Sequence, residues 1–288
     1  MDTLSATDSY LSLLLSLPQL ELMTVLSVFF LTLARVIPIM ALCPFLGAKN
    51  VPATIRVLFS VALVAIFLPQ NLLATHTNIF FSHTFIWLFL KELIIGFILG
   101  FLSMVPFLIA QMTGSLIDHQ RGASSLQVTD PTTQSQTGPV GILFNQVTIV
   151  LFFYLDGPFI FFNGIASSYQ LIPVDGLISP FFFQLEIPFW KQAIALLQFM
   201  MNLSIQIAAP ALIGVLLTDM FLGIANRLAP QVQIVFLGIA LKSWVGIALM
   251  TAAWGLMLQV INKESVTWMQ SLQSLIEQVG YHYVKKGP

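Results

Sequence analysis

Long apolar runs separated by short polar segments dominate this sequence. Runs with few or no charged residues lie at about 21–46, 55–70, 84–112, 140–162, 191–217 and 232–261. Crossing the hydrocarbon core of a bilayer takes about 20 residues of helix. The pattern therefore predicts an all-α polytopic membrane protein with about six hydrophobic helical segments.

Several of these predicted spans are irregular. Arg35 lies near the middle of the first run, the second run is short, and Asp156-Gly157-Pro158 interrupts the fourth. Because a charged side chain in lipid is costly, we expect Arg35 to face a protein or water interior. Proline and glycine within apolar runs also predict broken helices.

Composition supports the membrane class and excludes others. Of 288 residues, 57% are hydrophobic and 8% are charged, against about a quarter charged in an average soluble domain. The net charge of −1 gives no electrostatic basis for binding nucleic acid. Cys43 is the single cysteine, which excludes an internal disulfide and a cysteine metal site.

Loop charges give only part of a topology. Lys49 and Arg56 in the first polar loop favour the cytoplasm by the positive-inside rule. Alternating the later loops then places Lys263, Lys285 and Lys286 outside, which is the wrong side for that rule. Either one segment does not cross the membrane, or assembly overrides simple topology.

The most polar stretch lies mid-chain, in a predicted loop at 113–139. It has three possible roles: a membrane loop facing water, a catalytic site or a gate. Asp118 and Arg121 are three residues apart, so they can pair across one helical turn or bind neighbouring subunits. The candidate gate residues are Asp118, Gln120, Arg121, Gly122, Asp130 and Pro131.

A second group of residues points to helix packing and assembly. Gly96 and Gly100 are four apart on one helix face, which allows another helix backbone to approach closely. Charges near 218–231 and in the run behind it are either solvated in a hairpin turn or contact like hairpins in an assembly. The candidate packing and assembly residues are Lys91, Glu92, Gly96, Gly100, Pro210, Asp219, Gly223, Arg227, Pro230, Gln231 and Lys242.

Two segments have less certain roles. Residues 156–190 combine proline and phenylalanine with few charges, which favours an interfacial or re-entrant segment or a surface that docks onto other subunits. Apolar residues at three- and four-residue spacing within 263–288 predict an amphipathic tail helix. That helix can lie on a membrane or pack on a partner.

Catalytic and cofactor motifs are missing from the sequence. It contains no H-E-x-x-H, G-x-S-x-G or P-loop motif. Asp118 and His119 are adjacent, and adjacent helical side chains point about 100° apart, which makes a poor chelate. We therefore predict no enzymatic activity, no metal site and no cofactor.

Three stretches in order carry a family resemblance. These are "KELIIGFILGF", then "GSLIDHQRGASS" followed by Asp130-Pro131, then "AAPALIGVLLTDMFLGIANRLAPQVQIVFLGIALK". Together they resemble the SctT family, also called YscT or SpaR, of type III secretion export apparatus proteins. This family is related to flagellar FliR. The Asp118-x-Gln120-Arg121-Gly122 string resembles the injectisome branch.

The resemblance implies an architecture and a set of partners. Residues 1–188 would form an SctR-like helical part, 189–262 an SctS-like helical hairpin, and 263–288 the tail. With SctR-like and SctS-like subunits, and SctU-like and SctV-like export proteins nearby, the chain would build a bacterial inner-membrane gate that is displaced toward the periplasm. Unfolded polypeptides would pass through this gate, and the loop at 113–139 would plug it.

Two functions from other classes stay open. A small-molecule secondary transporter also uses broken helices and buried charges, but it predicts inverted repeats, and we find none between the halves. A stand-alone ion channel predicts a symmetric homo-oligomer with a ring of polar residues along the pore. Neither function explains the ordered three-part motif.

Overall fold

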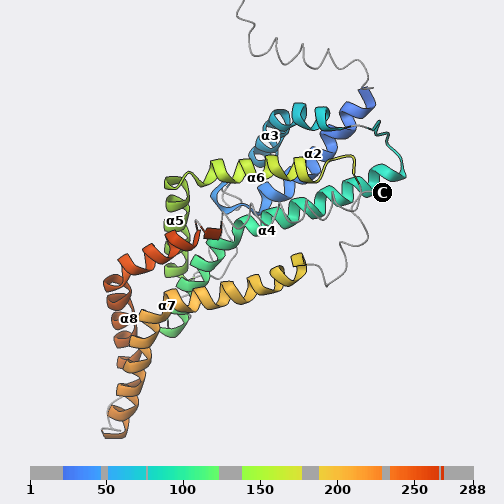
Figure 1. The fold of residues 1–288 in the computed structure, drawn as a ribbon. Coiled ribbons are helices and arrows are strands. Elements are labelled where there is room, and N and C mark those ends of the chain that lie inside the picture. The colour runs from blue at the N-terminus through green and yellow to red at the C-terminus, as the bar shows by residue number, and fades with distance from the viewer. Residues whose placement is uncertain are drawn as a thin grey trace, which may run out of the picture. The chain divides into compact units, whose positions relative to one another are not determined.

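The computed structural model describes residues 22–46, 51–75, 77–122, 138–176, 188–228, 234–265 and 267–268. Within these ranges every regular element is a helix, which confirms the predicted all-α class (Figure 1). The elements are α2 (Leu22–Leu42), η1 (Pro44–Leu46), α3 (Ala53–Ala74), α4 (His83–Gln120), α5 (Pro139–Tyr154), α6 (Gly157–Leu171), α7 (Pro188–Leu228) and α8 (Ile234–Ala252). A further helix spans Trp254–Ser265.

Four helices in the described part are long and apolar enough to cross a membrane: Leu22–Leu42, Ala53–Ala74, His83–Gln120 and Ile194–Leu228. Two bent pairs raise this to six if each pair counts as one span. α5 and α6 meet at 76°, and Gly238–Ala252 meets Trp254–Ser265 at 61°. The prediction of about six segments with broken helices is therefore confirmed.

The chain divides into two compact units. The first comprises 1–102, 163–184 and 276–288, and the second comprises 103–162 and 185–275. α4 and α6 each begin in one unit and end in the other. The family resemblance implies another boundary, at residue 188, between an SctR-like and an SctS-like part. That boundary stays a prediction.

The core of the first unit forms where α2 packs beside α3 (Figure 1). α2 buries an apolar stripe that includes Val28, Leu31, Val36 and Ile39. Three- and four-residue spacing places such a stripe on one helix face. The start of α4 and the end of α6 complete this unit, which holds all the side chains of the first ion cluster described below.

The second unit is built around the helical hairpin of α7 and α8 (Figure 1). Glycines on the hairpin bring the two helices close, because added Cβ atoms at Gly214 and Gly246 would meet the side chains of Leu249 and Val215. Aromatic contacts add to this unit: the Phe107 and Phe152 rings lie 5.4 Å apart and those of Phe144 and Trp254 lie 5.3 Å apart.

Two sequence-based boundaries were wrong because the helices are longer than the apolar runs. α4 continues to Gln120, so residues 113–120 of the predicted loop are helical. α7 continues to Leu228, which places Asp219 and Arg227 on a helix and not in a turn. An apolar run shows which residues suit a lipid environment and does not mark where a helix ends. Polar residues such as Ser, Asp and Gln can continue the helix at a small cost.

Candidate functional site

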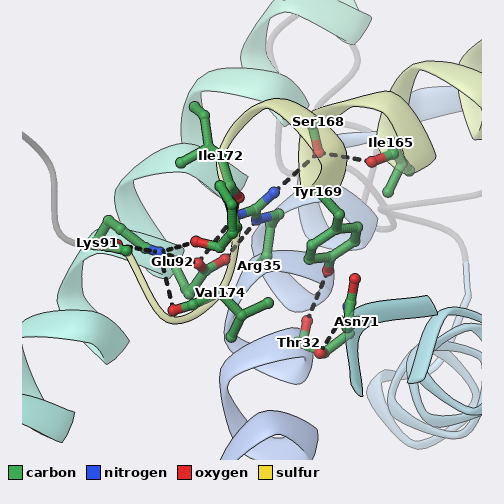
Figure 2. Close-up of polar contacts among 12 residues, drawn as sticks. Thr32, Arg35, Asn71, Lys91, Glu92, Ile165, Ser168, Tyr169, Ile172 and Val174 are labelled. Carbon is green, nitrogen blue, oxygen red and sulfur yellow. Dashed lines mark hydrogen bonds and ion pairs between the residues drawn. The ribbon is translucent and has the colours of Figure 1, made fainter. Parts of the chain in front are cut away.

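The first candidate cluster surrounds Arg35 in the middle of α2. Its guanidinium donates to both carboxylate oxygens of Glu92 on α4, from Nε to Oε2 at 2.5 Å and from Nη2 to Oε1 at 2.9 Å (Figure 2). Both side chains are completely buried. This two-point geometry fits a planar guanidinium against a carboxylate, and it confirms that Arg35 faces a protein interior.

The remaining contacts of Arg35 come from the end of α6. Nη1 donates to Ser168 Oγ at 3.1 Å, and Nη2 donates to the carbonyl oxygen of Ile172 at 2.9 Å. The guanidinium also lies 4.1 Å from the centre of the Tyr169 ring, a cation–π distance. Tyr169 in turn donates its hydroxyl to the carbonyl of Thr32 at 3.2 Å (Figure 2). Arg35 therefore joins three helices.

Lys91 extends the same cluster toward the chain that follows α6. Its Nζ lies 2.7 Å from Glu92 Oε1, and it donates to the carbonyl oxygens of Pro173 at 2.8 Å, Val174 at 3.1 Å and Gly176 at 2.9 Å. The side chain is 3% exposed. One carboxylate and three carbonyls thus replace the water shell of a buried ammonium.

The charges of the cluster are not balanced by carboxylates alone. Arg35 and Lys91 share the single buried carboxylate of Glu92. A buried charge is tolerated only with compensating partners. Here backbone carbonyl oxygens, which carry partial negative charge, accept hydrogen bonds from Arg35 and Lys91 and compensate the excess positive charge. The cluster is a structural lock, because removing any member leaves another charge or carbonyl buried without its partner.

The two predicted packing glycines hold α4 against α2 at this cluster. A Cβ at Gly96 would collide with the carbonyl oxygen of Arg35, and a Cβ at Gly100 would lie 3.1 Å from the backbone of Ile39 and Pro38. Side chains there would push the helices apart and lengthen the Arg35–Glu92 contact. The backbone of α2 therefore approaches α4 closely at Gly96 and Gly100.

The second candidate cluster lies at the end of α4, in the second unit. Arg121 donates to Asp118 Oδ1 from Nε at 2.9 Å and from Nη2 at 2.5 Å, across one helical turn. Arg121 Nη1 also donates to Ser243 Oγ on α8 at 3.4 Å. Both charged side chains are almost fully buried.

Asp118 also closes the beginning of α5. Its Oδ2 accepts hydrogen bonds from the backbone N–H groups of Val140 at 2.9 Å and Gly141 at 3.3 Å. The first N–H groups of a helix have no partner within that helix, and the N-cap residue Gly138 has no side chain to offer. Asp118 therefore caps α5 from another helix, and its negative charge interacts favourably with the positive end of the α5 dipole.

Glycines make room for this cap. A Cβ at Gly138 would collide with the Asp118 carboxylate, and a Cβ at Gly114 would come within 2.5 Å of the Gly141 backbone. The end of α4 and the beginning of α5 are thus fastened together, and these are the two helices that flank the predicted gate segment. Gly122 follows with φ of 81°, a left-handed conformation that suits glycine.

A third ion pair joins α7 and α8 within the hairpin. Lys242 pairs with Asp219, and their side chains are 27% and 35% exposed. Lys242 was predicted either to be solvated or to contact like hairpins in an assembly, and here it pairs with Asp219 of its own hairpin. Lys242 is therefore partly exposed to solvent and partly compensated by a carboxylate of the same chain.

The other predicted residues fall into two groups. Gln120 ends α4, Pro210 lies inside α7, and Gly223 and Arg227 are exposed on α7. Asp130, Pro131, Pro230 and Gln231 lie outside the described residues, as does most of the predicted tail helix at 263–288.

Comparison with known proteins identifies the family. A model of the family described as "Bacterial export proteins, family 1" matches residues 26–267. The chain belongs to this family.

Individual relatives agree with the family match. The chain is 29% identical over 218 residues to the "Surface presentation of antigens protein SpaR" of Shigella flexneri, covering 74% of this chain and 79% of the relative. It is 33% identical over 162 residues to the "Secretion system apparatus protein SsaT" of Salmonella typhimurium, covering 56% and 61%. It is 25% identical over 252 residues to the "Flagellar biosynthetic protein FliR" of Bacillus subtilis, covering 88% and 95%.

These matches confirm the resemblance to the SctT and SpaR family, injectisome branch, with flagellar proteins as relatives. Both ion clusters fall within the matched residues 26–267. The relatives are secretion and export apparatus proteins, and multiple apolar helices in such a family indicate an inner-membrane protein.

Several residues of the clusters were not predicted from the sequence. Ser168, Tyr169 and the carbonyl groups of 172–176 complete the first cluster, and Ser243 joins the second. The adjacent polar residues of "SSYQ" at the end of an apolar helix were an available signal. The backbone carbonyl partners could not be predicted, because every residue has a carbonyl group whatever its side chain.

The chemistry available at these clusters is limited. Among the described residues no group of three His, Cys, Asp or Glu side chains is arranged to hold a metal ion. Arg35, Glu92, Asp118 and Arg121 are each occupied by buried partners within the chain. The arrangement holds helices in place, which fits a structural role in an assembly or a gate.

Proposed function

We propose that this chain is a subunit of the type III secretion export gate. With SctR-like and SctS-like proteins it forms the inner-membrane and periplasmic entrance pore through which unfolded proteins are exported. The observation that carries the proposal is the family match over residues 26–267, joined to relatives named for secretion and translocation. SctU-like and SctV-like export proteins are proposed as further neighbours.

The surface of the hairpin supports an assembled state. α7 exposes large apolar side chains along its length, among them Ile213, Leu217, Met220, Phe221 and Ile224. Contiguous apolar surface of this kind requires lipid or a protein partner to cover it. We propose that lipid and neighbouring gate subunits share this role, and that the assembly displaces much of the chain from the bilayer toward the periplasm.

The proposed role involves no chemistry by this subunit. Its relatives are apparatus, translocation and biosynthetic proteins by name, and the charged clusters are used for holding helices. The transporter and channel alternatives gain no specific support from the clusters, since neither cluster leaves an open site for a solute or ion.

Within the gate, we propose that the segment between α4 and α5 serves as the plug. The segment itself, residues 123–137, lies outside the described residues. Support comes from its two ends, where Asp118 fastens the last turn of α4 to the first turn of α5. A segment mounted on a rigid base can change position without loss of the surrounding packing.

The export role is tested by deleting the gene in the native bacterium and measuring the proteins released into the medium. We expect release of the type III substrates to stop, and to return when the intact chain is supplied. Normal release from the deletion strain would contradict the proposed function.

The plug is tested separately with a chain that lacks residues 124–136 and with Arg121→Ala. We expect increased ion leakage across the inner membrane, measured by the loss of membrane potential, with altered secretion. If leakage and secretion both stay unchanged, the plug proposal is wrong while the export role remains testable on its own.

A further inference from the structure

The chain that follows α6 presents a concentrated set of carbonyl groups to two cations. Ile172 directs its carbonyl to Arg35, and Pro173, Val174 and Gly176 direct theirs to Lys91. Four carbonyl groups within five residues thus point to one side. Every carbonyl oxygen carries partial negative charge, and that of Ile172, directly after α6, also lies at the negative end of the helix.

Three of these carbonyls converge on a single atom. Lys91 Nζ lies 2.8 Å from the oxygen of Pro173, 3.1 Å from that of Val174 and 2.9 Å from that of Gly176. A primary ammonium has three N–H donors on one compact charge. The planar fork of an arginine points its donors in divergent directions and does not match three oxygens around one point.

We propose that residues 173–176 form a carbonyl cage for a primary ammonium, that Lys91 is its resident cation, and that this contact positions the chain where it leaves α6. The cage belongs to the first unit. Val174 and the whole Lys91 residue are 3% and 4% exposed, and the hydrogen bonds to Pro173 and Gly176 are partly buried. This inference concerns the fold of that unit and does not depend on the export role.

The cage also explains the second positive charge of the cluster. Without Lys91, Arg35 and Glu92 remain a balanced pair, so the side-chain charges alone do not require the lysine. The Val174 carbonyl does, because a buried carbonyl without a donor is destabilising, and the part-buried carbonyls of Pro173 and Gly176 gain the same ammonium as a donor. Removal of the ammonium is therefore expected to release this segment and leave the Arg35–Glu92 pair in place.

The test uses thiol labelling of the chain in its native membrane. Cys43, which is fully buried, is replaced by Ala, and Val174→Cys is introduced as the reporter of the segment. Val64→Cys is the matched control, since Val64 is equally buried in α3 of the same unit. Labelling by N-ethylmaleimide is timed in each background with and without Lys91→Met, which keeps most of the apolar stem and removes the ammonium.

We expect Lys91→Met to speed labelling at position 174 by about tenfold or more, since charge-assisted hydrogen bonds resist local opening. Labelling at position 64 should change by less than about twofold, because the rest of the unit keeps its own packing. Equal acceleration at both positions would mean that Lys91 supports the whole unit, and no acceleration would mean that the segment is held by other contacts. Either result overturns the proposal.

Chemical rescue provides the second measurement. In a Lys91→Ala chain with Val174→Cys, n-propylammonium should slow labelling again, because it returns a primary ammonium to the cage. Propanol and tetramethylammonium at the same concentration should not, since the first lacks the charge and the second lacks N–H donors. Rescue by all three compounds, or by none, would show that the cage does not select an ammonium.

Discussion

Glu92 is the residue on which the first cluster depends, because its one carboxylate serves two buried cations. Arg35 binds both of its oxygens, and Lys91 shares Oε1. Replacing one partner of a buried pair is costly because the other charge stays buried without compensation.

We expect Glu92→Gln to destabilise the protein by about 3–5 kcal/mol, and Arg35→Met to destabilise it by less because Lys91 still pairs with Glu92. The double variant should be less destabilised than the sum by about 0.5–3 kcal/mol, since contacting residues couple. Thermal or denaturant unfolding of the four purified proteins in one detergent gives this coupling. Additive effects would show that the two side chains act independently.

Glycine positions give a sharper contrast between contact and open space. Gly96→Ala places a Cβ against the carbonyl oxygen of Arg35, whereas Gly223→Ala meets nothing within 4 Å. We expect Gly96→Ala to cost about 1–3 kcal/mol through forced separation of backbones. Gly223→Ala should be neutral or stabilising by up to about 1 kcal/mol, since alanine is favoured over glycine inside a helix such as α7. The same unfolding measurement compares them, and equal losses would refute the close approach of α2 and α4.

Sequence reasoning identified most side chains of the clusters but not their partners. It selected Arg35, Lys91 and Glu92 because charges in apolar runs require an explanation. It did not pair Arg35 with Glu92, which is 57 residues away, because one sequence contains no record of which helices lie side by side. Asp118 and Arg121 were paired correctly, since spacing of three residues within a helix fixes their separation.

At the scale of elements, one side chain fastens the end of α4 to the beginning of α5. Asp118 binds Arg121 with one oxygen and the first turn of α5 with the other. This arrangement requires α4 to remain helical past its apolar run. The helix continues to Gln120, whereas the sequence predicted a loop from residue 113.

Asp118→Ala is expected to loosen the first turn of α5. Loss of an N-terminal cap costs about 0.5–2 kcal/mol, and Arg121 also loses its buried carboxylate. Hydrogen exchange of a peptide that begins at residue 138 should become faster, with a peptide from α3 as the unchanged control. Unaltered exchange at the start of α5 would contradict the capping role.

The corner between α5 and α6 has a local cause. Asp156 adopts φ of 56°, which is unfavourable for residues that carry a Cβ. A Cβ at the next residue, Gly157, would press on the Phe152 ring. The sequence Asp-Gly-Pro therefore specifies a 76° bend, and the predicted interruption of this span is confirmed.

Asp156→Gly is expected to raise stability by up to about 1 kcal/mol, because glycine takes positive φ without a steric cost. Gly157→Val is the opposing variant and should lower stability by about 1–3 kcal/mol through overpacking. Unfolding transitions measured side by side would decide. A loss of stability with Asp156→Gly would mean that the aspartate side chain makes a contact worth more than the relieved strain.

At the scale of the whole molecule, the sequence predicted the class and the number of segments from apolar runs alone. It could not predict the two compact units, because their boundaries at 102 and 162 fall inside the continuous helices α4 and α6. The hairpin of α7 and α8 was predicted from its two runs, but the Asp219–Lys242 pair within it was not.

The central claim is that this chain works as one subunit of a hetero-oligomeric gate. Native mass spectrometry of the tagged chain, purified from its own membrane in mild detergent, tests this most directly. We predict one copy of this chain bound to several copies of two smaller hydrophobic proteins. A monomer or homo-oligomer that stays intact and binds a small solute would contradict the account and favour a transporter.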